Sequence, residues 1–249
     1  MLRRAFLAGI ASGAVAAAPV RASETTLRAV ADEWPPFSGS ALPNKGLSLD
    51  VITTVLRRAG HRVEADILPW ARIMVGARTG RHDIIGSLFF DPTLTDVLTY
   101  CEEPYYRTDI KLVRRKGSDI TYAGLESLRP YSIAVGDGFL YTEAFDRAKG
   151  LNKIVVTTTI QGVQMVAHGR ADLTIDSVEV IRHAIQQEDP TLADRVEFLE
   201  PALGTRSLHM AVSKALPNRA QVVADFNRVL AEMQHDGSMQ DLLRRHNLT

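Results

Sequence analysis

The chain has a single cysteine, Cys101, so it cannot form an intramolecular disulfide or a cysteine-based zinc or redox site. Charge of one sign is not in surplus either: 29 basic residues balance 29 acidic ones, whereas a nucleic-acid partner would require a basic excess. A charged fraction of 23% and a mean hydropathy of -0.05 exclude a disordered, collagen-like or polytopic membrane protein. The 249 residues therefore predict a globular chain with one large domain or two small ones.

Residues 1–22 are predicted to be a secretory signal peptide. Arg3 and Arg4 precede a short stretch rich in alanine and glycine, and a small-residue cleavage site ends at Ala22. The stretch is too short and too often interrupted to anchor the chain in a membrane. The paired arginines resemble a twin-arginine signal. We expect cleavage after Ala22 and a periplasmic mature chain, which loses three arginines and no acid and so has a formal charge of −3.

After residue 26, short β-rich runs alternate with amphipathic helical runs, which predicts an α/β fold with parallel strands. One helix is expected at 47–59, with Gly60 ending it. The series occurs twice, and TGRHDII at 79–85 is similar to HGRADLTI at 168–175. This similarity fits either an internal duplication or a common helix-ending pattern. Both interpretations predict two lobes, with a ligand cleft where the parallel strands end.

Seven segments occur in an order that resembles one known family. They are LRAVADEWPPFSG, KGLSLDVITTVLRRAG, LPWARIMVGARTGRHDII, EEPYYRTDIKLVRRKGS, LRPYSIAVGDGFLYTEAF, HGRADLTIDS and FNRVLAEMQHDGSMQDLLRRH. In this order they resemble the bacterial extracellular solute-binding proteins of family 3. The resemblance implies a two-lobed periplasmic-binding fold of type II, with mainly parallel sheets, helices on both faces and a cleft that closes on its ligand. Lobe one is expected at 23–107 plus 208–249, and lobe two at 108–207.

The resemblance also implies ligand-binding residues. Trp34 and Trp70 match the aromatic side chains that pack on the ligand, although a tryptophan can equally be a core residue. Asp176 matches the acid that binds the ligand's amino group; the alternative is a helix N-cap. Phe37, Ser87, Tyr141 and Glu179 are assigned to the same site.

Departures from the family pattern indicate an unusual ligand. Leu94 occupies the place of an arginine that clamps the α-carboxylate of amino acids in this family. Phe89 and Phe139 replace smaller hydroxyl residues. A standard α-amino acid is therefore disfavoured. Arg72 either supplies a replacement charge or is a solvated helix arginine.

Trp34, Trp70, Phe89 and Phe139 with Asp176 are predicted to form an aromatic box containing an acid, which suits an amine or quaternary ammonium group. An opposite hypothesis is an anion held by Arg72 and by a helix that begins at Gly138-Phe139.

Catalytic motifs such as Gly-x-Ser-x-Gly, a Walker loop or paired metal-binding histidines do not occur. We therefore expect a monomeric binding protein without cofactor or metal. The family resemblance implies that it delivers a small ligand to the membrane permease of an ABC importer. Two alternatives are a ligand-presenting sensor protein and a lyase. The lyase alternative rests on a resemblance of Asp176-Ser177-Val178-Glu179 to cyclohexadienyl dehydratases, with Glu179 as the general acid.

Overall fold

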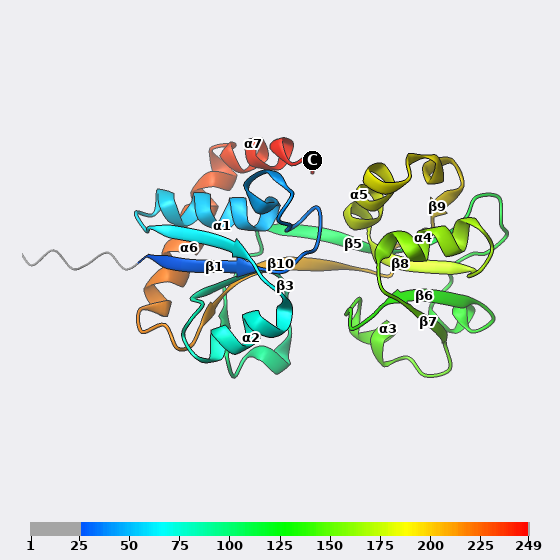
Figure 1. Ribbon diagram of the computed structural model, residues 1–249, viewed down its shortest axis with the longest axis horizontal. Coiled ribbons are helices and arrows are strands. Elements are labelled where there is room, and N and C mark those ends of the chain that lie inside the picture. Colours follow the sequence, from blue (N-terminus) through cyan, green and yellow to red (C-terminus); the bar gives the residue numbers. More distant parts are fainter. Residues whose placement is uncertain (1–25, 249) are drawn as a thin grey trace, which may run out of the picture.

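Two long antiparallel strands, β5 (Tyr106–Arg115) and β10 (Gly204–Ser213), join two lobes (Figure 1). The computed structural model describes residues 26–248, so the predicted signal peptide lies outside the described residues. The strands pair from Tyr106 opposite Leu208 to Ile110 opposite Gly204. The lobe boundaries predicted at 107/108 and 207/208 fall inside this paired stretch, and the division itself stays a prediction.

The first lobe contains the first and the last of the described helices and strands (Figure 1). Its strands are β1 (Leu27–Ala31), β2 (Val63–Ile67), β3 (Ile84–Phe89) and β4 (Leu98–Tyr100). Its helices are α1 (Leu47–Arg58), α2 (Trp70–Arg78), α6 (Arg219–His235) and α7 (Ser238–Arg245), with short 3-10 turns η1 (Pro43–Lys45) and η2 (Pro92–Leu94). The expected helix at 47–59 is confirmed to within one residue, and Gly60 follows it with φ +93°.

The second lobe comes from the middle of the chain. Its strands are β6 (Ser132–Gly136), β7 (Asn152–Val156), β8 (Leu173–Ser177) and β9 (Val196–Phe198). Its helices are α3 (Glu143–Arg147), α4 (Thr159–Ala167) and α5 (Val178–Glu188), with 3-10 turns η3 (Leu125–Leu128) and η4 (Pro190–Asp194).

Both lobes have the same strand order, which matches the repeated plan expected from the sequence. The sheet runs β2-β1-β3-β10 in one lobe and β7-β6-β8-β5 in the other. The first three strands of each set pair in parallel, while β10 and β5 pair antiparallel to β3 and β8. Because the parallel strands of each set end toward the other lobe, the residues after them meet at the interlobe face.

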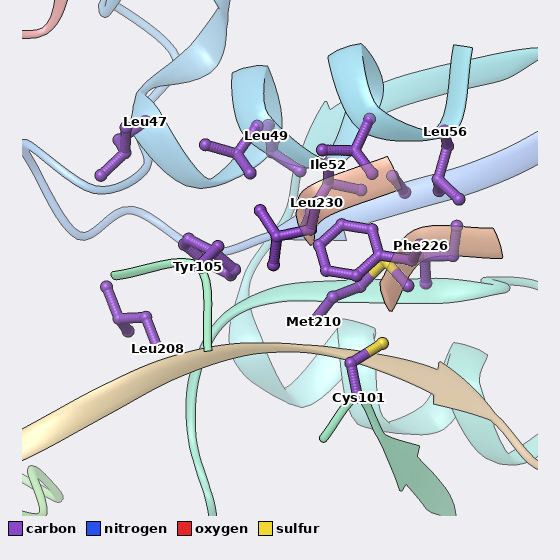
Figure 2. Packing of buried hydrophobic residues seen from close by; sticks show 14 of the residues in the cluster. Leu47, Leu49, Ile52, Leu56, Cys101, Tyr105, Leu208, Met210, Phe226 and Leu230 are labelled. Carbon is purple, nitrogen blue, oxygen red and sulfur yellow. The ribbon is translucent and has the colours of Figure 1, made fainter. Parts of the chain in front are cut away.

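Side chains of β1 alternate between two apolar clusters, because helices cover both faces of the first sheet. Leu27, Ala29 and Ala31 join the apolar cluster beneath α1 and α6, and Val30 joins a second cluster with Ile73 of α2. The larger cluster brings helices from the two ends of the chain together, and Figure 2 shows α6 residues beside those of α1.

Cys101 lies in this larger cluster (Figure 2) and is buried. Burial raises the pKa of its thiol to about 12. It therefore acts as a small apolar side chain.

None of the helices within 26–248 combines the length and apolarity that crossing a membrane requires.

Candidate functional site

A cleft of about 420 Å³ lies between the lobes at the ends of the parallel strands. Lobe one lines it from the residues after β1, the start of α2, and the end of β3 with the turn that follows. Lobe two contributes the turn after β6, and β10 contributes one side chain. The lining residues are Asp32, Trp34, Trp70, Ser87, Leu88, Phe89, Asp91, Leu94, Asp137, Gly138, Phe139, Leu140 and Arg206. This is the location expected for the ligand of such a fold.

Aromatic rings from both lobes form much of the cleft wall. Trp34 is 9% exposed and its ring centroid lies 5.3 Å from that of Phe89, edge to face. Trp70 of lobe one and Phe139 of lobe two are 39% and 41% exposed, so their apolar faces remain available. Phe37, which was also assigned to the site, is fully buried 4.9 Å from Trp34 and supports that ring without lining the cleft.

A network of hydroxyl groups holds Ser87, which lines the cleft, in place. Its backbone N–H donates to Tyr105 Oη at 3.2 Å, and its Oγ donates to Ser38 Oγ at 2.8 Å. Tyr105 Oη in turn donates to Ser48 Oγ at 2.7 Å, and burial raises the pKa of Tyr105. Ser87 has φ +57°, a rare conformation for a residue with a side chain, and such strained residues gather at functional sites.

Three carboxylates line the cleft against one guanidinium. Burial is the main cause of a raised pKa for Asp32, and the neighbouring Glu33 adds to it. Asp91 caps the turn after β3, since its Oδ1 accepts from Thr93 N at 2.8 Å. Asp137 is exposed on the lobe-two side. The excess of negative charge favours a ligand with a cationic group.

The one guanidinium belongs to Arg206 of β10. Its Nη1 donates to the Tyr141 carbonyl oxygen at 3.0 Å and its Nη2 to the Phe90 carbonyl oxygen at 3.4 Å. The group stands 4.5 Å from the ring centroid of Phe89. Burial lowers its pKa, and the charges of Asp146 and Asp91 act in the opposite direction. Arg206 was not predicted from the sequence, because no motif marks an arginine on a crossover strand. Asp32 and Asp137 were also not predicted, although Asp32 lies two residues before Trp34 and Asp137 directly precedes Gly138.

Five of the predicted site residues come together in the cleft: Trp34, Trp70, Ser87, Phe89 and Phe139. Arg72 and Tyr141 do not line the cleft. Arg72 lies on an exposed face of α2, and Tyr141 is buried, with its Oη accepting from the backbone N–H of Gly136 at 2.7 Å.

The helix start expected at Gly138-Phe139 is wrong. The chain makes a turn there, and α3 begins at Glu143 after its N-cap Thr142, whose Oγ1 accepts from Phe145 N at 3.3 Å. Gly138 has φ +71°, which directs the chain into the turn. The anion hypothesis based on this helix start therefore loses its backbone donors.

Asp176 is buried within lobe two and does not line the cleft. Its Oδ2 accepts from Thr159 Oγ1 at 2.8 Å and its Oδ1 from the backbone N–H of Ser177 at 2.8 Å. It is not the N-cap of α5 either, since Ser177 holds that position. The acids that line the cleft with the four aromatic residues are Asp32, Asp91 and Asp137, and Asp176 is not among them.

Glu179 lines a second cavity between the lobes, of about 560 Å³, rather than the cleft that contains Trp34. Its carboxylate accepts from Tyr106 Oη at 3.0 Å and from Thr108 Oγ1. These contacts tie α5 to the crossover strand β5. The part of the chain that the structure describes contains no cluster of histidine, cysteine, aspartate or glutamate suited to a metal ion.

The burial of Asp176 predicts a pH-dependent stability. Burial raises its pKa to about 6 from an ordinary 3.8, so the folded chain retains a proton that the unfolded chain has lost between these values. This contribution to stability therefore falls as the pH rises from 4 to 6. Asp176→Asn removes the ionisable group and keeps an oxygen for Ser177. At pH 7.5 we expect this variant to be more stable than the parent by roughly 2 to 3 kcal/mol.

Urea unfolding of both proteins at pH 4, 5 and 7.5 measures this difference. Carboxylates with a lowered pKa, such as Asp50 and Asp225, change the stability with pH in the opposite direction. Their contributions are the same in both proteins, so they cancel in the difference between the two free energies of unfolding. A constant difference at all three pH values would contradict the assignment.

Two lobes joined by two crossover strands, with a cleft where parallel strands of both lobes end, define the class of type II periplasmic-binding folds. The chain belongs to the bacterial extracellular solute-binding proteins, family 3, whose family profile matches residues 27–249. It is a ligand-binding protein of this family.

Individual relatives are distant. The L-cystine-binding protein TcyA of Bacillus subtilis (strain 168) is 22% identical over 205 residues, which cover 80% of this chain and 71% of that protein. A histidine kinase sensor domain with similarity to periplasmic binding proteins matches with a TM-score of 0.72 and 18% identity, over 88% of this chain and 95% of that one. The substrate binding protein of an amino acid ABC transporter matches with a TM-score of 0.67 and 15% identity, over 89% and 98%. These two structural matches show a shared fold.

Proposed function

We propose that this chain is a periplasmic solute-binding protein that closes on a small amine-containing ligand, other than a standard α-amino acid, and delivers it to the permease of an ABC importer. The main support for this proposal is the composition of the interlobe cleft, which is lined by three carboxylates and by the aromatic residues Trp34, Trp70, Phe89 and Phe139. Aromatic faces and carboxylates both attract ammonium groups, and each cation–π contact contributes about 0.5 to 2 kcal/mol.

Asp32 is the carboxylate that this proposal depends on most. It lies half-buried two residues before Trp34, and burial raises the pKa of its carboxyl. Within residues 26–248 it forms no ion pair. A ligand ammonium group would supply the missing counter-charge, since a buried carboxylate without a partner is costly. Leu94 places an apolar side chain at the expected carboxylate clamp, which disfavours binding of an α-carboxylate at that position.

The relatives support an importer and leave one alternative. One relative is the substrate binding protein of an amino acid ABC transporter, which favours transport for this chain. Another is a histidine kinase sensor domain, so presentation of the ligand to a sensor is the second candidate. A lyase has less support, because Glu179 lies outside the aromatic cleft and is hydrogen-bonded to Tyr106.

Asp32→Asn tests the proposal. Thermal shifts of the purified mature protein with primary amines, quaternary ammonium compounds, α-amino acids, carboxylates and prephenate identify the ligand class, because a ligand at 100 times its Kd stabilises by about 2.7 kcal/mol. A charge-assisted hydrogen bond contributes about 1.5 to 3 kcal/mol. We therefore expect Asp32→Asn to weaken binding of the best cationic ligand at least about tenfold by calorimetry.

Asp96→Asn is the matched control, because Asp96 is exposed on the same lobe and does not line the cleft. It makes the same change in net charge and should leave the Kd unaltered. An equal loss of affinity in both variants would show that the change in net charge, acting at long range, weakens binding. Binding of standard α-amino acids alone would overturn the proposed ligand class, and consumption of prephenate would show that the protein is a lyase.

A further inference from the structure

The lobe-two wall of the cleft presents apolar side chains to solvent. Phe139 and Leu140 follow the turn after β6, line the cleft, and are 41% and 53% exposed. Within residues 26–248, three of the six exposed large apolar side chains line this one cleft: these two and Trp70 of lobe one. Apolar surface left in water is unfavourable, and its concentration in a concave site is typical of a place that a ligand covers.

The turn after β6 holds the Phe139 ring in place. The backbone N–H of Phe139 donates to the Gly136 carbonyl oxygen at 3.3 Å, and Gly138, the third residue of this turn, has the positive φ of +71° that type II turns require there. A side chain on Gly136 would bring its Cβ to 2.8 Å from Phe139 Cδ2, so the ring lies directly against this glycine. A wall that its own turn fixes needs little ordering when a ligand binds.

Lobe one supplies an apolar surface of its own. Leu88 near the end of β3, Leu94 of the η2 turn and Trp70 at the start of α2 all line the cleft. A cleft of about 420 Å³ has room for much more than an ammonium group. An ammonium group therefore leaves most of this space to the rest of the ligand, and apolar side chains of both lobes are available to contact that part.

The charged groups of the cleft favour a ligand with one cationic end. Three carboxylates line the cleft, and the guanidinium of Arg206 already donates to the carbonyl oxygens of Tyr141 and Phe90. A second charged group on the ligand would lose its water against Phe139 and Leu140, which is costly without a partner. A ligand that suits both the charges and the walls thus combines one cationic group with an uncharged, apolar remainder.

We infer that the amine of the ligand is attached to an apolar body, an alkyl chain or an aromatic ring, which binds between Phe139 and Leu140 of lobe two and Leu94 of lobe one. This inference rests on the proposed function, which supplies the cationic end at Asp32. An apolar body held there covers side chains of both lobes at once. Because the closed arrangement buries more of this apolar surface than the open one, such a ligand favours closure of the cleft.

The test compares amines that differ in their apolar part. Titration calorimetry of the purified mature protein uses ethylamine, butylamine and hexylamine, and then 1,6-diaminohexane and 1-hexanol. A fully buried methylene group contributes about fourfold in Kd, so hexylamine should bind at least about 30-fold more tightly than ethylamine. The compound 1,6-diaminohexane has the same chain with a charge at each end, and it should bind at least about tenfold more weakly than hexylamine.

Leu140→Asn replaces an apolar side chain of the cleft with a polar one of similar size. It should lower the ratio of the ethylamine Kd to the hexylamine Kd at least about fivefold, whereas Leu140→Met stays apolar and should retain the parent ratio. Val155→Asn is the matched control, because Val155 is 62% exposed on β7 of the same lobe and does not line the cleft. This control should also keep the parent ratio. Circular dichroism and urea unfolding check that each variant is folded.

The outcomes separate this inference from the proposed function. Equal binding of the three monoamines, binding of 1,6-diaminohexane as tight as that of hexylamine, or an unchanged ratio in Leu140→Asn overturns the inference and leaves the proposed function standing. An equal fall of the ratio in Val155→Asn also overturns the inference, because the effect then does not arise in the cleft. Binding of 1-hexanol as tight as that of hexylamine supports the apolar site and overturns the proposed preference for a cation. Absence of binding by every probe overturns both.

Discussion

Trp34→Ala is expected to weaken binding of the cleft's ligand about 100-fold or more. Trp34 packs on Phe37 and Phe89, so its removal opens the wall against which the ligand would lie. Buried aromatic anchors at the centre of a binding site typically contribute 2 to 4 kcal/mol, and about 2.7 kcal/mol corresponds to 100-fold in Kd. Calorimetry with the best ligand of the thermal-shift panel measures the change.

Two further variants keep this prediction specific. Trp34→Phe preserves an aromatic face and should recover most of the affinity, which separates loss of the ring from general misfolding. Trp70→Ala removes a more exposed ring at the mouth of the cleft and should cost about tenfold. The chain has only these two tryptophans, so each alanine variant leaves one indole as a fluorescent reporter of ligand binding. Binding by Trp34→Ala within threefold of the parent would show that the ligand lies elsewhere.

Local patterns predicted the alternation of strands and helices, and the family resemblance added the two-lobed fold and the aromatic residues of the cleft. The apolar spacing after Gly46 predicted α1, and residues at strand-to-helix junctions, such as Trp34 and Trp70, had to meet at the interlobe face once parallel strands were inferred. The spacing of apolar residues depends on neighbouring positions in the chain. The location of the cleft follows from the rule that ligands bind at the carboxyl ends of parallel strands.

The charges of the cleft could not be predicted in the same way. Asp176 directly precedes the N-cap of α5, a position from which a side chain can face the cleft or the lobe interior, and hydrogen bonds from Thr159 and Ser177 hold it in the interior. Arg206 reaches the cleft because of the antiparallel register of β10 with β5, and β10 also changes register against β3 between His209 and Ala211. Registers of strands about a hundred residues apart are not visible in local spacing.

Phe226→Ala is expected to lower the free energy of unfolding of the first lobe by about 3 to 5 kcal/mol, the typical cost of deleting a buried phenylalanine side chain. Phe226 is fully buried on α6 and packs in the cluster that α1 and β10 share (Figure 2). Because α6 comes from the chain's last part and α1 from its first, this cluster holds both segments of the predicted lobe one together. Hydrogen exchange should show the loss of protection in α1, β1 and α6.

Phe145→Ala is the matched change in the other lobe. Phe145 is fully buried in a separate cluster with Ile133 and Leu173, and its ring also accepts the Lys153 ammonium at 4.3 Å. If the chain divides as predicted, Phe145→Ala lowers protection in β6 and β8 and leaves α1 and α6 unchanged, while Phe226→Ala does the reverse. Uniform loss of protection in both variants would mean that the lobes unfold as one unit. Because the cleft needs a wall from each lobe, either variant should weaken ligand binding by lowering the population in which both walls are folded.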